Sequence, residues 1–461
     1  MAQSKRVNDD LIDALRDLLG ERLSTSEAVR EQHGHDESYH EGHAPDLVVF
    51  PQSTEEVSEI VKLCAARDVP IIPFGTGTAL EGGVAALNGG VCIDLMSMNE
   101  IVQVNAEDMD VRVQPGVTRK QLNLYLRDTG LFFPMDPGAD ASLGGMTATR
   151  ASGTNAVRYG TMRENVLAMT VVLADGRIIR TSRRARKSAA GYDLTRLFVG
   201  SEGTLGVITE ITLRLVGIPE AVTTAVCSFE DVEPAINTVI ATIQTGVPVA
   251  RVEFLDDVQM QAMAKYSDLD YPARPTLIFE FHGTKNAIAE QVETVKDIAK
   301  DFGAPEFHWV DNPEDRSRLW QARHDAYYAS LALRPGARGM ATDVCVPISR
   351  LAECIEKTRK DIDESGILAP IVGHVGDGNF HVVLLIDVDD EDELVRCKAF
   401  NERLVMRALA MEGTCTGEHG VGYGKIDFLT AEHGEAVSVM RALKMALDPQ
   451  NIMNPGKIVR L

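Results

Sequence analysis

The 461-residue chain lacks the features that mark several classes of protein. No stretch approaches about 18 consecutive apolar residues, so the sequence predicts no transmembrane helix. The seven cysteines show no Cys-x-x-Cys spacing. They therefore do not form an iron–sulfur site of the usual local spacing, and we expect them to be reduced and mostly buried. The net charge of −22 argues against a general affinity for nucleic acid or anionic lipid.

Two short segments of unusual composition have plain interpretations. The basic run 183–187 is expected to be a solvated loop, with a local phosphate contact as the alternative. Histidines 33, 35, 40 and 43 look like a metal-binding tract, but they precede any recognisable scaffold. We therefore expect a solvated linker there.

The order of hydrophobic patterns predicts more than one domain. An amphipathic helix is expected at about residues 8 to 22, followed from residue 45 by a strand, a capped helix and a second strand. Short β-rich segments then alternate with glycine loops as far as residue 216, and longer helices and strands in an α+β pattern follow. We place boundaries so that residues 1–43 form a helix and linker, 44–219 a first domain, 220–425 a second domain, and 426–461 a helical segment returning to the first.

Three glycine-rich segments are candidate binding loops. "PFGTGTALEGG" follows a predicted strand but is not a Rossmann fingerprint, because Leu80 occupies the third glycine position and no helical pattern follows. Its backbone N–H groups could surround phosphate oxygens, or the loop could be a structural turn. The run 135–160 is too long for a simple connector, and loops of this length usually bind a ligand. The third segment, "LTRLFVGSEGTLGVITEITLRL", is a glycine turn that enters a strand.

Together these segments resemble the flavin-binding domain of the vanillyl-alcohol-oxidase superfamily, and "GSEGTLGVITE" is similar to its D-2-hydroxy-acid branch. The resemblance extends from about Pro45 to the terminal "NPGKIV". It implies an α+β fold, with a PCMH-type FAD-binding domain of two subdomains and a cap domain built on an antiparallel sheet. It also implies noncovalent FAD, because no histidine lies between Pro73 and Gly90 to attach the flavin.

The resemblance further implies which residues contact FAD. The diphosphate would be held by Gly75, Thr76, Gly77 and Thr78. The other expected FAD contacts are Pro73, Leu80, Gly82, Asp136, Pro137, Ser142, Gly145, Thr149, Gly153, Ala156, Glu202, Ile208 and Asn454.

The stretch "GHVGDGNFHVVLLI" predicts a pair of opposed histidines. If residues 376–379 close a hairpin, Val375 pairs with Phe380 and His374 with His381, and the imidazoles share one face of the sheet. That placement suits two ligands of one metal ion, although two histidines on a polar sheet face would look the same. "GEHG" adds a carboxylate and an imidazole, and two histidines with one carboxylate form a divalent-metal set with open positions. Adjacent residues generally point different ways, so one ligand and one base is the economical assignment.

The family resemblance makes that assignment specific. It implies that His374, His381 and Glu418 bind Zn²⁺, Mn²⁺ or Fe²⁺, and that His419 is the general base. The metal would bind the carboxylate and α-hydroxyl of the substrate while His419 removes the hydroxyl proton and a hydride passes to flavin N5. Arg323 would clamp the substrate carboxylate, with a surface ion pair as the alternative, and Asn379 would add a hydrogen bond.

Four stretches resemble the cytochrome-linked D-lactate dehydrogenases: "RHDAYYASLALRPG", "TDVCVPISRL", "IVGHVGDGNFH" and "GTCTGEHGVGYGK". Relatives that oxidise D-2-hydroxyglutarate carry a lysine where this chain has Ala341, so we expect a short or apolar D-2-hydroxy acid as the substrate. The alternatives are D-2-hydroxyglutarate dehydrogenase and the catalytic subunit of a glycolate-oxidase-type multi-chain dehydrogenase. A flavin-free metallohydrolase and a flavin-binding module without catalysis are more distant alternatives.

The same resemblance implies an external electron acceptor, which would be cytochrome c, a quinone or an electron-transfer flavoprotein. The sequence leaves homodimer formation open. The N-terminus lacks both the apolar core of a secretory signal and an Arg-rich, acid-poor transit segment. We therefore expect a cytoplasmic enzyme of bacterial type, with peripheral membrane association left open.

Overall fold

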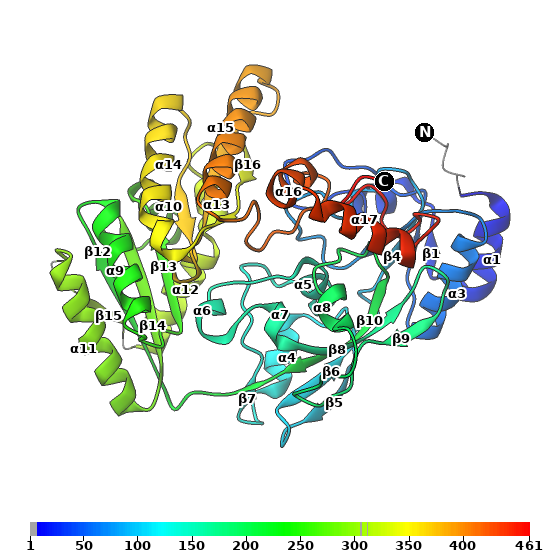
Figure 1. Cartoon of the computed structure of the whole chain (residues 1–461), viewed down its shortest axis with the longest axis horizontal. Helices are drawn as coiled ribbons and strands as arrows, with labels where there is room; N and C mark the ends of the chain where they lie inside the picture. The colour runs from blue at the N-terminus through cyan, green and yellow to red at the C-terminus, as the bar shows by residue number, and fades with distance from the viewer. Residues whose placement is uncertain (1–6, 305–306, 311) are drawn as a thin grey trace. The chain divides into compact units, whose positions relative to one another are not determined.

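The computed structural model describes residues 7–304, 307–310 and 312–461. The chain forms two compact units (Figure 1). The first contains residues 1–151, 161–218 and 418–461, and the second contains residues 152–160 and 219–417. Residues near the C-terminus belong to the first unit, where the amide of Ile71 donates to Ile452 O over 2.7 Å and the amide of Asn454 donates to Ile71 O over 2.8 Å. The C-terminal segment therefore completes the unit that the N-terminal segment begins.

The first part of unit 1 is a small sheet of order β1-β2-β4-β3, in which β2, β4 and β3 are parallel. Helix α3 connects β2 to β3. Its N-cap is Ser53, whose hydroxyl accepts from Glu56 N over 3.1 Å, and the helix buries the apolar positions that its sequence period predicts. The bounds are β1 (Leu23–Ser24), β2 (Leu47–Val49), β3 (Ile71–Phe74), β4 (Val91–Asp94), α1 (Asp9–Leu19), α2 (Glu27–Gln32) and α3 (Thr54–Ala65).

The second part of unit 1 is an antiparallel sheet of order β5-β6-β10-β8-β9, with a separate short pair formed by β7 and β11. Its core includes Phe133, Phe198 and the inward side chains of β8 and β10. The strands are β5 (Ile101–Asn105), β6 (Asp110–Val113), β7 (Leu131–Phe132), β8 (Val166–Val172), β9 (Ile178–Arg180), β10 (Val207–Arg214) and β11 (Val216–Gly217). The helices are α4 (Arg119–Leu126), α5 (Leu143–Thr149), α7 (Met162–Asn165), α8 (Leu194–Phe198), α16 (Ile426–His433) and α17 (Ala436–Leu447).

Unit 2 is built on an antiparallel sheet of order β15-β12-β14-β13-β18-β19-β16, with β17 also pairing β19. On one face Leu255, Ile278 and Val372 pack against Leu319 and Trp320 of α12. The strands are β12 (Ala221–Ser228), β13 (Arg251–Leu255), β14 (Thr276–Gly283), β15 (His308–Val310), β16 (Arg338–Ala341), β17 (Val344–Cys345), β18 (Ile371–Gly373) and β19 (Asn379–Ile386). The α-helices are α6 (Ala156–Tyr159), α9 (Val232–Gln244), α10 (Asp257–Ser267), α11 (Lys285–Asp301), α12 (Pro313–His324), α13 (Ala326–Leu331), α14 (Leu351–Ser365) and α15 (Glu391–Ala410).

The predicted hairpin register around the two histidines is wrong. Strands β18 and β19 do pair, but Val372 lies opposite His381, and Val344 of β17 lies opposite Phe380. Residues 374–378 form the connection through a 3-10 turn at Val375–Asp377 that ends at Gly378, whose φ is +80°. This left-handed residue lets a longer connection close than the four-residue loop that the sequence suggested. His374 is therefore in the connection rather than in the strand.

The expectation of a solvated histidine linker is also wrong for His33. This side chain is 5% exposed, with Nδ1 2.7 Å from Val29 O and Nε2 2.9 Å from Asp94 Oδ2. The segment thus packs onto the end of β4. The basic run is largely exposed, as expected, with Arg184 paired to Asp108 and Asp110. The prediction of mostly buried cysteines is confirmed, because only Cys345 of the seven is partly exposed.

Candidate active site

The first glycine loop begins directly after β3. A side chain at Gly75 would meet Ser142 Oγ at 2.5 Å, and Gly77 has a φ of +71° with its missing Cβ position 2.9 Å from the Phe74 ring. Among the described residues, the backbone amides from Thr76 to Gly82 donate to no protein acceptor. A run of such amides suits phosphate oxygens. The sequence showed no helical pattern after this loop, and the described residues between β3 and β4 contain no helix.

The other predicted loops of unit 1 meet this one. The Ser142 amide donates to Thr76 Oγ1 over 3.4 Å, and its hydroxyl caps α5 by accepting from Gly145 N over 3.3 Å. The Asn454 side chain donates to Gly83 O over 3.0 Å and to Glu202 O over 2.7 Å. The structure therefore brings together four segments that the sequence analysis assigned separately to FAD.

The remaining predicted FAD contacts have varied surroundings. Buried Asp136 pairs with Arg119 at 3.0 Å, and Pro137 follows it. Thr149 donates to Gly145 O over 3.1 Å within α5, and Ile208 is buried in β10. Two others, Gly153 and Ala156, lie in the 152–160 stretch that groups with unit 2.

The loop that carries His419 is held by two buried glutamates of unit 1. The Glu202 carboxylate accepts from Val421 N at 2.7 Å and from Gly422 N at 2.8 Å. Burial raises the pKa of Glu202 to about 7 against the opposing effect of these two hydrogen bonds. A side chain at Gly422 would lie 1.9 Å from Glu81 O, so glycine is needed for this close approach. The carboxylate of Glu202, which was predicted as an FAD contact, thus binds the loop that carries His419.

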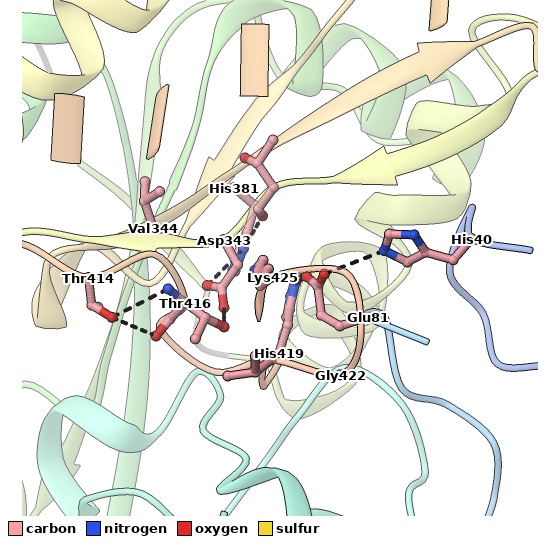
Figure 2. A network of polar contacts seen from close by, with 12 residues as sticks. His40, Glu81, Asp343, Val344, His381, Thr414, Thr416, His419, Gly422 and Lys425 are labelled. Carbon is pink, nitrogen blue, oxygen red and sulfur yellow. Dashed lines mark hydrogen bonds and ion pairs between the residues drawn. The ribbon is translucent and has the colours of Figure 1, made fainter. Parts of the chain in front are cut away.

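The second glutamate faces His419 itself. Glu81 Oε1 lies 3.8 Å from His419 Nδ1 and 2.8 Å from Lys425 Nζ, and Oε2 lies 3.7 Å from His40 Nε2 (Figure 2). Burial opposes ionisation of Glu81, but the charge of Lys425 and the two histidines outweigh it and lower its pKa to about 2. Sequence reasoning missed Glu81 and Lys425. The available signal was a charged residue in each of two glycine-rich loops.

In unit 2 the predicted pair of histidines comes together despite the different register. The ring centroids of His374 and His381 are 5.6 Å apart with the planes at 81°. The Nδ1 atom of His374 lies 2.8 and 3.0 Å from the Glu253 carboxylate oxygens, and Nδ1 of His381 lies 3.0 Å from Thr342 O. An acceptor at each Nδ1 favours the tautomer whose lone pair is on Nε2, which is the usual arrangement of metal-binding histidines. The pair therefore fits a divalent metal.

The predicted substrate arginine is bound to the same glutamate. Arg323 Nη2 lies 2.5 Å from Glu253 Oε2, and both residues are buried. Burial opposes ionisation of Glu253, but Arg323 and His374 lower its pKa. Among the described residues, Nε of Arg323 has no hydrogen-bond partner. A buried donor of this kind suits an anionic ligand. The surface ion-pair alternative is thus wrong, and Glu253 is a residue that sequence reasoning missed.

Asn379 is part of a polar cluster around Asp343. Its amide donates to Asp343 Oδ1 over 2.8 Å and to Val344 O over 2.9 Å. Thr416 Oγ1 donates to Asp343 Oδ2 over 2.8 Å (Figure 2). A side chain at Gly417 would lie 2.3 Å from Asn379 Nδ2. Gly417, the residue directly before Glu418, therefore packs closely against this cluster.

Comparison with known proteins identifies the family. Residues 45–182 match the FAD binding domain, and residues 218–458 match the C-terminal domain of FAD linked oxidases. The chain belongs to the FAD-linked oxidases. It is 58% identical to the probable mitochondrial D-lactate dehydrogenase of Danio rerio, over 98% of this chain and 92% of that protein.

Two further relatives cover most of this FAD-linked oxidase. It is 48% identical to the mitochondrial D-lactate dehydrogenase [cytochrome] of Arabidopsis thaliana, over 99% of this chain and 81% of that protein. It is 34% identical to the glycolate oxidase subunit GlcD of Bacillus subtilis, over 95% of this chain and 94% of that protein. The structure matches 4-ethylphenol oxidase from Gulosibacter chungangensis with a TM-score of 0.82 at 20% identity, covering 98% of each chain. The PCMH-type fold and the FAD-binding domain are thereby confirmed.

One expectation from the sequence is overturned by these relatives. The oxidase was expected to be cytoplasmic, whereas its Danio rerio and Arabidopsis thaliana relatives are mitochondrial enzymes by name. A targeting segment is separate from the folded domain, so the sequence of the domain does not record the compartment. In the described part of the chain, no helix combines the length and apolar character needed to cross a bilayer.

Proposed function

We propose that this FAD-linked oxidase converts a short D-2-hydroxy acid, with D-lactate as the representative substrate, to the 2-oxo acid. The observation that carries the proposal is the convergence of Arg323 and His374 on Glu253 in unit 2, with the His381 ring beside that of His374. The guanidinium of Arg323 can donate hydrogen bonds to an anion, and the two imidazoles beside it are suited to bind a metal ion. These groups match the carboxylate and hydroxyl of a 2-hydroxy acid. The D-lactate dehydrogenases among its relatives support the choice of substrate.

The first glycine loop is the proposed binding site of the FAD diphosphate. Its amides between Thr76 and Gly82 fit phosphate oxygens, and Ser142 and Gly145 place the second loop against it. When bound, FAD supplies the acceptor for the hydride from the substrate Cα. We propose that FAD is noncovalent, because the segment from Pro73 to Gly90 contains no histidine.

His374, His381 and Glu418 are the proposed ligands of Zn²⁺, Mn²⁺ or Fe²⁺. The acceptors at the two Nδ1 atoms support Nε2 coordination, and Glu418 follows Gly417, which packs against Asn379. Such a metal supplies Lewis acidity that lowers the pKa of the substrate hydroxyl. Asn379 is the proposed additional hydrogen-bonding group of this site.

His419 is the proposed general base that accepts the hydroxyl proton. Glu81 lies beside its Nδ1, and Glu202 fixes the backbone of the same loop, so both glutamates support one orientation of the imidazole. The buried Nε of Arg323 is the proposed donor to the substrate carboxylate. The proposed proton acceptor, His419, and the proposed carboxylate-binding residue, Arg323, are thus each held in place by contacts with buried glutamates.

Ala341 is the proposed determinant of substrate size. It lies opposite Val383 on β19, on the same sheet face as His381, because residues two apart in a strand share a face. Its methyl group offers no cation for a second carboxylate. Burying an unpaired carboxylate would cost several kcal/mol, so we expect D-lactate to be preferred over D-2-hydroxyglutarate.

The electron acceptor is proposed to be cytochrome c, with a quinone or an electron-transfer flavoprotein as alternatives. The Arabidopsis thaliana relative carries "cytochrome" in its name, which supports the first. The second candidate function is the catalytic subunit of a glycolate-oxidase-type complex, favoured by the Bacillus subtilis relative. We would compare kcat/KM for D-lactate, glycolate and D-2-hydroxyglutarate with an artificial acceptor and the isolated chain. The highest value with D-lactate supports the proposal, and activity only with glycolate, or only with added subunits, supports the alternative.

A further inference from the structure

Glu253 is an acidic residue in the middle of a core strand. Its side chain is completely buried, and each of its two carboxylate oxygens makes a polar contact. Oε2 pairs with Arg323 Nη2 at 2.5 Å, and His374 Nδ1 lies 2.8 Å from Oε1. One carboxylate therefore contacts both the residue proposed to bind the substrate carboxylate and a residue proposed to bind the metal.

Three elements produce this convergence. Glu253 points toward the sheet face that packs on α12, as its strand neighbour Leu255 does. Arg323 follows Trp320 by three residues and so lies on the same side of that helix. His374 directly follows β18, which pairs with β13 beside Glu253. The contact is thus fixed by core elements rather than by mobile surface side chains.

We propose that Glu253 is a positioning residue that couples metal binding to carboxylate recognition. Its carboxylate accepts a hydrogen bond from Nδ1 of His374, so that Nε2 of this imidazole is available to the metal. The same carboxylate pairs with Nη2 of Arg323, so that Nε of this guanidinium is available to the substrate. A single carboxylate then sets the orientation of both groups. This inference rests on the proposed function of the same site.

The competing explanation is a purely structural ion pair, and the chain contains a matched control for it. Glu280 on the neighbouring β14 is also buried between an arginine and a histidine: it lies 3.4 Å from Arg251 Nε and 2.8 Å from His282 Nε2. Within the described part of the chain, the side-chain partners of Glu280 are Thr224, His282 and Arg251 rather than Arg323 or His374. Removing its charge disturbs the same sheet in a comparable way without touching the proposed site.

The test compares Glu253→Gln with Glu280→Gln in the FAD-loaded full chain. We would measure the Kd for Zn²⁺ by competition with a chelating dye, the KM and kcat for D-lactate at saturating metal, and the FAD content. Glu253→Gln is expected to raise the Zn²⁺ Kd by about 10- to 100-fold and to raise KM more than it lowers kcat, with FAD retained. Glu280→Gln is expected to leave the Zn²⁺ Kd and KM unchanged even if it lowers the melting temperature. Equal Zn²⁺ Kd and KM values for the two variants would overturn the proposal.

A second variant covers the case in which Glu253→Gln does not fold. Glu253→Asp keeps the charge but is one methylene shorter, so it is expected to lose contact with His374 or Arg323 and to raise the Zn²⁺ Kd or KM accordingly. Wild-type values of both would overturn the proposal. The wild-type protein separates the two hypotheses: absence of both Zn²⁺ binding and flavin reduction by D-lactate contradicts the proposed function itself, whereas a normal wild type with an inert Glu253 contradicts only this inference.

Discussion

The imidazole rings of His374 and His381 lie with their centroids 5.6 Å apart although the two residues are not strand partners. Replacing His374 by Ala is expected to lower bound metal and to raise KM for D-lactate, because one proposed metal ligand is lost while the proposed FAD contacts are untouched. Metal content by elemental analysis and steady-state kinetics check this. His282→Ala is the control, since that buried imidazole contacts Tyr159 and Glu280 instead. Full metal content in His374→Ala would contradict the assignment.

His419 is the proposed base, so its removal should affect the chemical step rather than cofactor binding. His419→Ala is expected to slow flavin reduction by D-lactate by roughly 10²-fold or more while FAD remains bound. Anaerobic stopped-flow measurement of the limiting reduction rate tests this. His433→Ala, in the last turn of α16, serves as the control. An unchanged limiting rate in His419→Ala would rule out the role of base.

Ala341 allows a direct test of substrate choice. The wild type is expected to prefer D-lactate to D-2-hydroxyglutarate, and Ala341→Lys to shift kcat/KM toward the diacid, because the new ammonium group pairs with the second carboxylate. Ala341→Met separates the charge from the added length. Comparable kcat/KM for the two acids in the wild type would contradict the proposed specificity.

Glu202 predicts a pH dependence of stability. Burial raises its folded-state pKa to about 7 from the ordinary value of 4.5. The folded protein therefore binds more protons than the unfolded chain between these values, and this contribution to stability is lost as pH rises through that interval. The loss is on the order of 3 kcal/mol. Glu202→Gln does not titrate and should flatten the fall in melting temperature from about pH 5 to about pH 8. An identical slope in wild type and variant would contradict this.

The sequence correctly predicted features of secondary structure that neighbouring residues determine. The apolar period of α3 and its cap at Ser53 both appear as expected, because neighbouring residues determine a helical face and its first turn. The hairpin register depended instead on the 3-10 turn before Gly378 and on the pairing of Phe380 with Val344, more than thirty residues earlier in the chain. A local turn pattern contains neither piece of information.

The same reasoning explains which site residues were missed. Glu253 meets His374 across 121 positions of sequence, so nothing near either residue predicts the contact. The run 135–160 was interpreted as one flavin loop, but residues 152–160 group with unit 2. There the Asn155 side chain accepts from Arg251 Nε over 2.7 Å, and Tyr159 lies 2.7 Å from His282. Tertiary contacts of this kind appear only once the sheet is assembled.

The central claim is that one hydroxy acid reacts with both a metal and a flavin on this chain, and the visible spectrum tests it most directly. We would add D-lactate or L-lactate to the oxidised protein without oxygen, and repeat the experiment after chelation and after restoring Zn²⁺ or Mn²⁺. The account predicts bleaching of the flavin by D-lactate only, loss of that bleaching on chelation, and its return with metal. A flavin that neither isomer reduces, or that D-lactate reduces equally well without metal, would contradict it.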